Sequence, residues 1–341
     1  MFEKSVRVTL ILTYIVIIAG AVVRMTGSGM GCPDWPKCFG YYIPPTSEEQ
    51  MDWHPNQDYH KGQIIIVDES LWVAKEAFTS KDEMDKAHFE RYTKHDYAEF
   101  NPVHTWVEYI NRLAGAVAGI AVFIMGIISI GHWRKSKSLV LLSWLSVFLM
   151  GFQAWLGATV VYSVLAPVRI TVHMVMALVI VALLLYILHK LQPRKQSLVK
   201  NKTLKRLLIA AVVLTLIQVV LGTQVREYID SQVKLLGQDR PDLWLASPEF
   251  SFYIHRSFSI LILLINLWIW QINRKLKLNI KWINTILMLI LLEVMTGIAM
   301  YNFEFPFSTQ ALHLVFASLL FGAQFYVLLQ VSQKEKIHLS N

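Results

Sequence analysis

Eight long apolar runs dominate this chain of 341 residues and restrict what it can fold into. Each run has roughly 20 residues, the length that an α-helix needs to cross the hydrocarbon core of a membrane. Hydrophobic residues make up 55% of the chain, which is typical of a polytopic membrane protein. The sequence therefore predicts an all-α integral membrane protein with eight transmembrane helices. We place them at about 6–24, 104–131, 139–161, 169–189, 207–225, 251–272, 282–302 and 309–331.

The charged residues predict how these helices cross the membrane. The amino terminus, the loops after the second, fourth and sixth runs, and the tail hold most of the lysines and arginines. Segment 25–102 carries more acidic than basic residues. Because positive loops face the cytoplasm, we expect a multi-pass protein of the cell membrane with both termini in the cytoplasm. The net charge of +8 is thus a signal of topology, and we expect no nucleic acid partner.

Polar motifs in the apolar runs occur twice, in the same order. Residues 1–190 and 191–341 therefore form two related halves of four helices each, in a parallel repeat. Ionisable groups at membrane depth are costly and usually mark functional sites. The repeated motifs are Gly20 and Arg24 with Gly222 and Arg226, Tyr109-Ile110-Asn111-Arg112 with Tyr253-Ile254-His255-Arg256, and Thr171-Val172-His173 with Ala311-Leu312-His313.

The second half carries two histidines, His255 and His313, near the outer ends of their helices. Two membrane histidines at matching depth can hold a haem iron from both sides. Arg256 and Arg226 are candidates to neutralise the haem propionates, because a guanidinium binds a carboxylate with two hydrogen bonds. The alternative is that each histidine is hydrogen-bonded within the helix bundle. We favour haem ligation because the pair is repeated.

The first half differs at one position of this pattern. It has His173, which matches His313, but Asn111 stands where the second histidine would be. A haem in this half would thus have one axial ligand from the protein, unless His104 supplies the other. His104 precedes Asn111 by seven residues, or roughly 10 Å of helix, so it could instead lie at the membrane interface.

Glu108 shares a helix face with His104 and Asn111, because spacings of three and four residues bring side chains together. Its carboxylate could accept a proton in catalysis. The alternative is a structural ion pair with Arg112, four residues later. Three further polar residues of the apolar runs lie near glycines, and we interpret them as helix packing contacts. They are Gln153, Gln218 and Glu293.

The outer segment 25–102 is the main asymmetry between the halves. We expect an amphipathic helix over 63–78 and a solvated helix over 79–100. This segment holds both cysteines of the chain, Cys32 and Cys38. An outer compartment permits disulfides, so the pair could be a structural staple, a redox-active pair or two free thiols.

The stretch from Gly20 to Cys38 resembles the haem A synthase family. It reads Gly20-Ala21-Val22-Val23-Arg24-Met25-Thr26-Gly27-Ser28-Gly29-Met30-Gly31-Cys32-Pro33-Asp34-Trp35-Pro36-Lys37-Cys38 and is similar to the cysteine-bearing bacterial members. Glu108-x-x-Asn111-Arg112 resembles the Glu-x-x-His-Arg motif of the family, and His173, His255 and His313 match its later membrane histidines. Asn111 departs from that motif, and the first outer loop is longer than the family leads us to expect.

The resemblance implies two pseudo-symmetric four-helix bundles with different haems. The carboxy-terminal bundle would hold a haem b cofactor between His255 and His313. The amino-terminal bundle would oxidise the C8 methyl of haem O to a formyl group, giving haem A for cytochrome oxidase. Arg24, Asn111 and Arg112 would line this substrate pocket, with His173 on the substrate iron, Glu108 as the catalytic carboxylate and Cys32 joined to Cys38.

The expected partners are haem O, membrane lipid, a haem O synthase, a redox partner and a second copy of the chain. The main alternative is a two-haem cytochrome b that exchanges electrons with quinone, and a haem transporter without chemistry is a third. Asn111 separates the first two hypotheses, because electron transfer favours two saturated irons and a substrate site benefits from one looser ligand.

Overall fold

The structure is a computed structural model that describes residues 1–192, 201–237, 239–306 and 308–332. It confirms the predicted all-α membrane fold, because these residues form eight helices that are long and apolar enough to cross a membrane. The helices are α1 (Phe2–Met25), α2 (Pro102–Ile130), α3 (Lys137–Tyr162), α4 (Pro167–Leu191), α5 (Lys202–Leu236), α6 (Phe250–Lys275), α7 (Trp282–Asn302) and α8 (Thr309–Val331).

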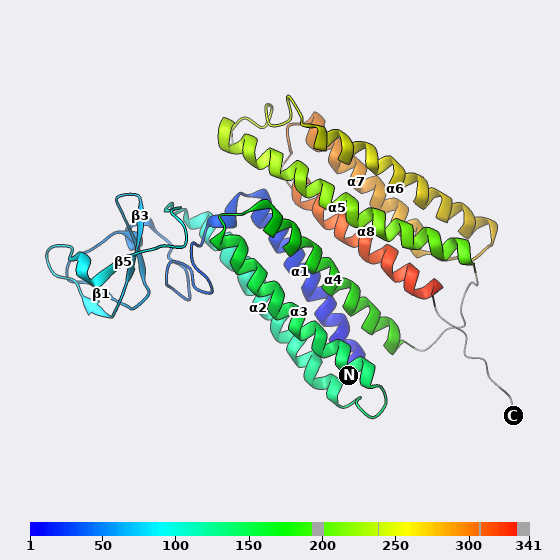
Figure 1. Ribbon diagram of the computed structural model, residues 1–341, viewed down its shortest axis with the longest axis horizontal. Coiled ribbons are helices and arrows are strands. Elements are labelled where there is room, and N and C mark those ends of the chain that lie inside the picture. The colour runs from blue at the N-terminus through cyan, green and yellow to red at the C-terminus, as the bar shows by residue number, and fades with distance from the viewer. Residues whose placement is uncertain (193–200, 238, 307, 333–341) are drawn as a thin grey trace.

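The helices pack as two neighbouring groups of four. Within the first group α1 contacts α2 and α4, and α3 contacts α2 and α4; within the second α5 contacts α6 and α8, and α7 contacts α6 and α8. Helices α1, α4, α5 and α8 form the contact between the groups. Figure 1 shows the two groups side by side, with the start of α1 and the end of α8 toward the end opposite the strands.

Each group has its own apolar core, and both cores lie toward the end that carries the start of α1. The first core contains Val6, Val122 and Leu184, all fully buried. The second, built from the start of α5 and α7 and the end of α6 and α8, contains Leu204 and Val327. Close packing therefore fills one half of each bundle, and the repeated histidines, with the glycines beside them, lie in the other half.

The outer segment contains short β-strands, so the two helices predicted over 63–78 and 79–100 are wrong. Strands β2 (Ile64–Val67), β3 (Ser70–Ala74) and β5 (Phe89–Arg91) form an antiparallel sheet in that order. Strands β1 (Asp58–Tyr59) and β4 (Phe78–Thr79) form a second pair. β-Branched residues are stiff and favour strands. Asp68 and Glu69, which join β2 to β3, both have positive φ, as a tight hairpin turn requires.

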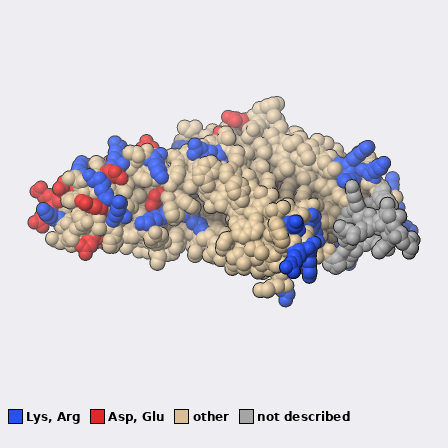
Figure 2. Space-filling model, turned by 60° about the horizontal axis from the view of Figure 1, so that its bottom comes forward, with Lys and Arg blue, Asp and Glu red and all other residues tan. Residues whose placement is uncertain are grey.

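Charged side chains are rare over the middle of the molecule. In Figure 2 acidic side chains gather mostly at the strand-bearing end, uncharged side chains cover the middle, and lysines and arginines cluster at the far end. An uncharged middle region on this face is what the hydrocarbon core of a bilayer requires.

Candidate functional site

Two histidines of the second bundle face each other. The ring centres of His255 on α6 and His313 on α8 are 6.3 Å apart, with the rings steeply inclined. Each imidazole lies against a glycine of a neighbouring helix. A Cβ atom on Gly222 of α5 would lie 3.1 Å from Cε1 of His255, and one on Gly297 of α7 would lie 3.7 Å from Cε1 of His313. Glycine at these positions makes room for the two rings.

The chemistry of this pair fits a metal held on an axis between two imidazoles. Bonds from imidazole nitrogen to metal are about 2 Å long, so two opposed ligands have their nitrogens about 4 Å apart and their ring centres further apart. The Nδ1 atom of His255 is buried without a hydrogen-bond partner among the described residues. Nowhere in those residues do three or more His, Cys, Asp or Glu side chains form a site for a bare metal ion. Two opposed imidazoles are the kind of ligands that hold an iron whose other ligands come from a porphyrin.

The first bundle repeats this geometry with one substitution. His173 of α4 lies against Gly157 of α3, where an added Cβ atom would be 3.4 Å from its Cε1 atom. Asn111 of α2 lies against Gly20 of α1, and an added Cβ atom would be 3.8 Å from Oδ1. This Oδ1 atom is buried without a partner among the described residues. Asn111 thus takes the place in the first half that His255 takes in the second.

His104 lies apart from this position. It is in the first turn of α2, where its backbone N–H donates to the Asn101 side chain that caps the helix. Gly31 packs so closely against the His104 carbonyl that a Cβ atom at position 31 would overlap it. Asn111 follows about two turns further along the helix. Ligation by His104 stays a prediction.

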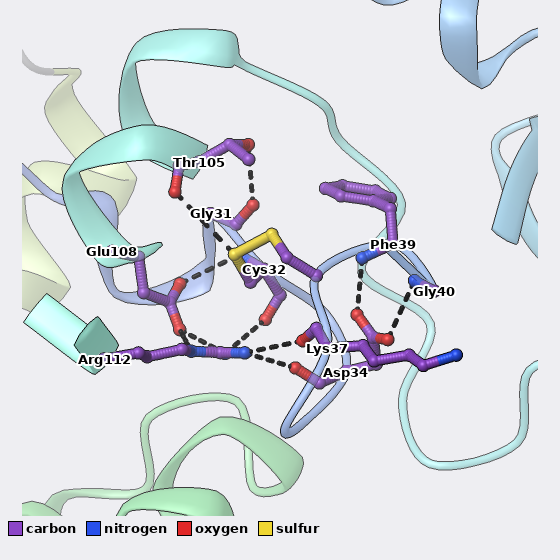
Figure 3. The surroundings of a disulfide bond; sticks show 10 residues. Gly31, Cys32, Asp34, Lys37, Phe39, Gly40, Thr105, Glu108 and Arg112 are labelled. Atoms are coloured by element: carbon purple, nitrogen blue, oxygen red, sulfur yellow. Dashed lines mark hydrogen bonds and ion pairs between the residues drawn. A yellow bond between two sulfur atoms is a disulfide. The ribbon is translucent and has the colours of Figure 1, made fainter. Parts of the chain in front are cut away.

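Glu108 and Arg112 form an ion pair that anchors the cysteine-bearing loop (Figure 3). Arg112 donates to Oε1 of Glu108 over 2.5 Å. The other carboxylate oxygen, Oε2, accepts the backbone N–H of Cys32 over 2.8 Å. Arg112 also donates to the carbonyls of Cys32, Asp34 and Lys37 over 3.1, 2.6 and 2.8 Å. The structural ion pair considered above is therefore present. Glu108, only 4% exposed, holds the loop through Oε2 and orients Arg112 through Oε1.

Cys32 and Cys38 are joined by a disulfide, as the resemblance implies. The hydroxyl of Thr105 donates to the Gly31 carbonyl over 2.7 Å, which ties the same loop to α2 a second time. Inside the loop, the Asp34 carboxylate accepts the backbone N–H groups of Phe39 and Gly40 over 2.6 and 2.9 Å. Burial raises the pKa of Asp34, and these donors with the nearby Arg112 oppose that rise. The disulfide thus closes a loop whose polar groups are already fixed.

We expect both cysteines to resist alkylation in native membranes. Both are at most 1% exposed and joined to each other, so a thiol reagent should label neither until a reductant is added. Peptide mass mapping of fresh membranes with and without reductant provides the measurement. Labelling of both thiols without reductant would contradict the pairing.

The repeated arginines Arg24 and Arg226 meet at the contact between the two bundles. Both pair with one carboxylate: Asp230 lies 2.8 Å from Nη2 of Arg24 and 2.8 Å from Nε of Arg226. Arg226 also donates to the Arg24 carbonyl over 3.1 Å. Arg256 is exposed and stacks over Phe252 and Tyr253. Propionate binding by Arg226 and Arg256 stays a prediction, and Asp230 is a polar partner that the sequence analysis missed.

Three further side chains contact the repeated histidines, which sequence reasoning did not predict. Glu293 and Thr296 of α7 both contact Nδ1 of His313, at 3.2 and 2.9 Å. Gln153 of α3 contacts Nε2 of His173 at 3.3 Å. The sequence held one signal for these contacts: Gln153 and Glu293 are separated along the chain by the same number of residues as His173 and His313.

A family model described as "Cytochrome oxidase assembly protein" (COX15-CtaA) matches residues 4–71 and 73–325. The chain is also similar to proteins named "Heme A synthase". One from Wolbachia pipientis wMel is 24% identical over 96% of this chain and 93% of its own length. One from Bacillus licheniformis is 25% identical over 96% of this chain and 94% of its own length. The match with the protein from Shewanella oneidensis, 25% identical, spans 55% of this chain and 45% of that relative.

Proposed function

This chain belongs to the family of cytochrome oxidase assembly proteins, and we propose that it is a haem A synthase, an oxidoreductase that converts the C8 methyl of haem O into the formyl group of haem A. One observation carries the proposal. The two bundles share a histidine pattern, but the second has two facing histidines where the first has His173 and Asn111. A pocket with two histidines suits a permanent cofactor, and a pocket with one histidine suits an exchangeable substrate of the same chemical class.

The second bundle is the proposed site of the haem b cofactor, held by His255 and His313. Held by these two histidines, the haem would supply one-electron transfer. The glycines beside the two rings leave room for them, and Arg226 and Arg256 are the candidates to pair with propionates. Arg226 would reach a propionate from its present pair with Asp230, which lies four residues further along α5.

The first bundle is the proposed substrate pocket. His173 would bind the iron of haem O from one side, and Asn111, a poor iron ligand, would leave the other side weakly held. Arg24 and Arg112 would lie at the rim, where Arg112 fixes the disulfide loop over the outer end of α2. Oxidation of a methyl to a formyl group replaces two hydrogens by one oxygen and turns haem O into haem A. In each turnover, haem O must enter the pocket and haem A must leave it. Weak axial ligation permits this exchange.

The alternative of a two-haem cytochrome b is less favoured. Electron transfer between two resident haems would benefit from two saturated irons, and the first bundle offers Asn111 at the position of the second ligand. The named relatives that cover almost the whole chain are haem A synthases.

The proposal includes the setting of the reaction. Both termini would lie in the cytoplasm of a cell-membrane protein, with the disulfide loop and the strands outside. A haem O synthase would deliver the substrate, a redox partner would accept electrons, and a second copy of the chain is a candidate partner.

Mass spectrometry of extracted haems tests the function. The full chain is expressed together with a haem O synthase in cells that make no haem A of their own. Haem A is expected in these cells, and only haem O in cells that receive the synthase alone. Unchanged haem O in both strains would overturn the proposal.

Glu108 is the proposed catalytic carboxylate, and Glu108→Gln should lower haem A output by about 100-fold, the scale of a lost acid–base group. The variant keeps the shape of the side chain but removes the charge that pairs with Arg112 and attracts the Cys32 N–H. We expect haem O or a hydroxylated intermediate to accumulate while the absorption bands of haem b persist. Extracted haems and spectra of the purified protein provide the measurement.

Thr105→Val is the matched control, because it removes another tie between α2 and the disulfide loop and leaves the carboxylate in place. A large loss in Glu108→Gln alone assigns the effect to the carboxylate. Equal losses in both variants would mean that Glu108 acts by positioning the loop. Full haem A output from Glu108→Gln would exclude an essential role.

A further inference from the structure

The two pockets differ in the side chain that contacts the repeated histidine. Glu293 and Gln153 occupy equivalent positions on α7 and α3, and each reaches the histidine that follows on the next helix, His313 or His173. One is a carboxylic acid and the other an amide. The two groups contact different ring nitrogens, so the pockets present different sides of the imidazole to a ligand.

In the second bundle, the contacts fix the hydrogen of His313 on Nδ1. The hydroxyl of Thr296 donates to the backbone carbonyl of Leu292 or Glu293, over 2.9 or 3.0 Å. With its hydrogen used in this way, the Thr296 oxygen accepts from Nδ1, 2.9 Å away. The Glu293 carboxylate oxygen lies 3.2 Å from the same nitrogen. Nδ1 therefore carries the hydrogen, and the lone pair of Nε2 is available for iron.

In the first bundle, the contacts occupy the other ring nitrogen. The Gln153 amide nitrogen donates to the His173 carbonyl over 3.0 Å, which fixes the orientation of the amide. Its second hydrogen points to Nε2 of His173, 3.3 Å away. Nδ1 of His173 is buried without a partner among the described residues. An iron that binds Nε2 must therefore displace an amide donor.

We propose that this repeated position determines how firmly each bundle holds its haem, with Glu293 securing the haem b ligand His313 and Gln153 keeping the His173 bond reversible. The inference rests on the proposed haem sites. A carboxylate beside the distal nitrogen of a ligating histidine orients the ring and increases its electron donation to the metal, and loss of such a partner costs about 10- to 100-fold in affinity. An amide on the ligating nitrogen competes with the metal instead. Glu293 and Gln153 are thus positioning residues that act through histidines.

Transfer of haem to apomyoglobin measures this property without enzyme turnover. The purified full chain with its resident haem is mixed with excess apomyoglobin, and the absorbance change gives the rate of haem loss. Glu293→Gln is expected to lose haem about 10- to 100-fold faster than the unaltered protein. Its midpoint potential is expected to become more positive. The reason is that a neutral amide increases electron donation from His313 to ferric iron less than a carboxylate does. Glu227→Gln makes the same chemical change at an exposed position of α5 and should alter neither value.

A second variant tests the first bundle. Ferric haem b serves as the probe and is added to the purified protein; the fraction that His173→Ala fails to bind defines the first pocket. Gln153→Leu removes the amide that competes for Nε2 of His173 and should release this fraction at least about tenfold more slowly, by the same scale of effect. An unchanged rate in either Glu293→Gln or Gln153→Leu, or an equal change in Glu227→Gln, would overturn the inference.

The outcomes separate this inference from the proposed function. If the resident haem bands persist in both His255→Ala and His313→Ala, the haem b assignment fails and the inference fails with it. If the bands depend on the two histidines but Glu293→Gln leaves rate and potential unchanged, only the inference fails.

Discussion

Substituting His313 or His255 with alanine is expected to remove the absorption bands of haem b from the purified protein. The two rings lie 6.3 Å apart, and each would supply one of two axial bonds. Loss of either ring leaves an iron with one protein ligand in a bundle shaped for two. A low-spin spectrum requires both ligands, so each single variant should lose it. Spectra of the reduced protein, together with haem content per polypeptide, provide the measurement.

His132→Ala is the matched control for these variants. His132 follows α2 at the far end of the first bundle, and its ring contacts that of Phe2. This variant removes one histidine from the same chain without touching either pocket, so its haem bands should be unchanged. Normal spectra in both His255→Ala and His313→Ala would refute the assignment of haem b to this pair.

Substituting His173 with alanine is expected to abolish haem A formation while the haem b spectrum stays intact. His173 is the one repeated histidine of the first bundle, so its loss leaves the substrate iron without the proposed ligand. A drop of at least about 100-fold is expected, beyond what loss of a supporting contact costs a metal site. Extracted haems report the product, and the spectrum of the purified protein reports the resident haem. If His173→Ala instead removes the resident haem b, the roles of the two bundles are reversed.

His104→Ala separates two versions of the substrate site. Loss of haem A output would support a ligand displaced along α2 toward its first turn. Near-normal output would support an iron that is open on the side of Asn111. The position of His104 beside Gly31, about two turns from Asn111, favours the open iron.

The helices could be predicted from the sequence because membrane spans have a strong and simple signal. Length and apolarity alone place all eight, and most errors are at the ends. The largest is in α5, predicted over 207–225 but extending from Lys202 to Leu236. Its last turns leave the apolar run and are held by contacts with distant residues. Ile229, for example, packs in a cluster with Phe252 and Trp244.

The outer segment was mispredicted because its apolar residues suit both an amphipathic helix and a hairpin. In β2, Ile64 and Ile66 join one apolar cluster and Ile65 and Val67 join another, so the run alternates between two faces. The turn at Asp68 and Glu69 decides between the two structures. β-Branching was the signal that favoured the strand.

The candidate site was predictable as a set of residue types but not as a set of contacts. Spacing brought Glu108 and Arg112 to one face of α2, and the structure confirms their ion pair. No pattern could show that Arg112 also reaches three carbonyls of a loop that lies some 75 to 80 residues earlier. The same holds for Asp230, whose pairing with Arg24 depends on how the two bundles pack.

The carboxylate shared by Arg24 and Arg226 determines which halves of this repeat can pack against each other. The two arginines are copies of one another, and the contact between the bundles brings these like charges together. Asp230 belongs to the extension of α5, which the first bundle lacks, because α1 ends at Met25, directly after Arg24. Two identical amino-terminal halves would thus meet with two cations and no counter-ion, and would repel. The halves of this protein are consequently not interchangeable: divergence at a single acidic residue makes the pairing of an amino-terminal half with a carboxy-terminal half more stable than the pairing of two amino-terminal halves.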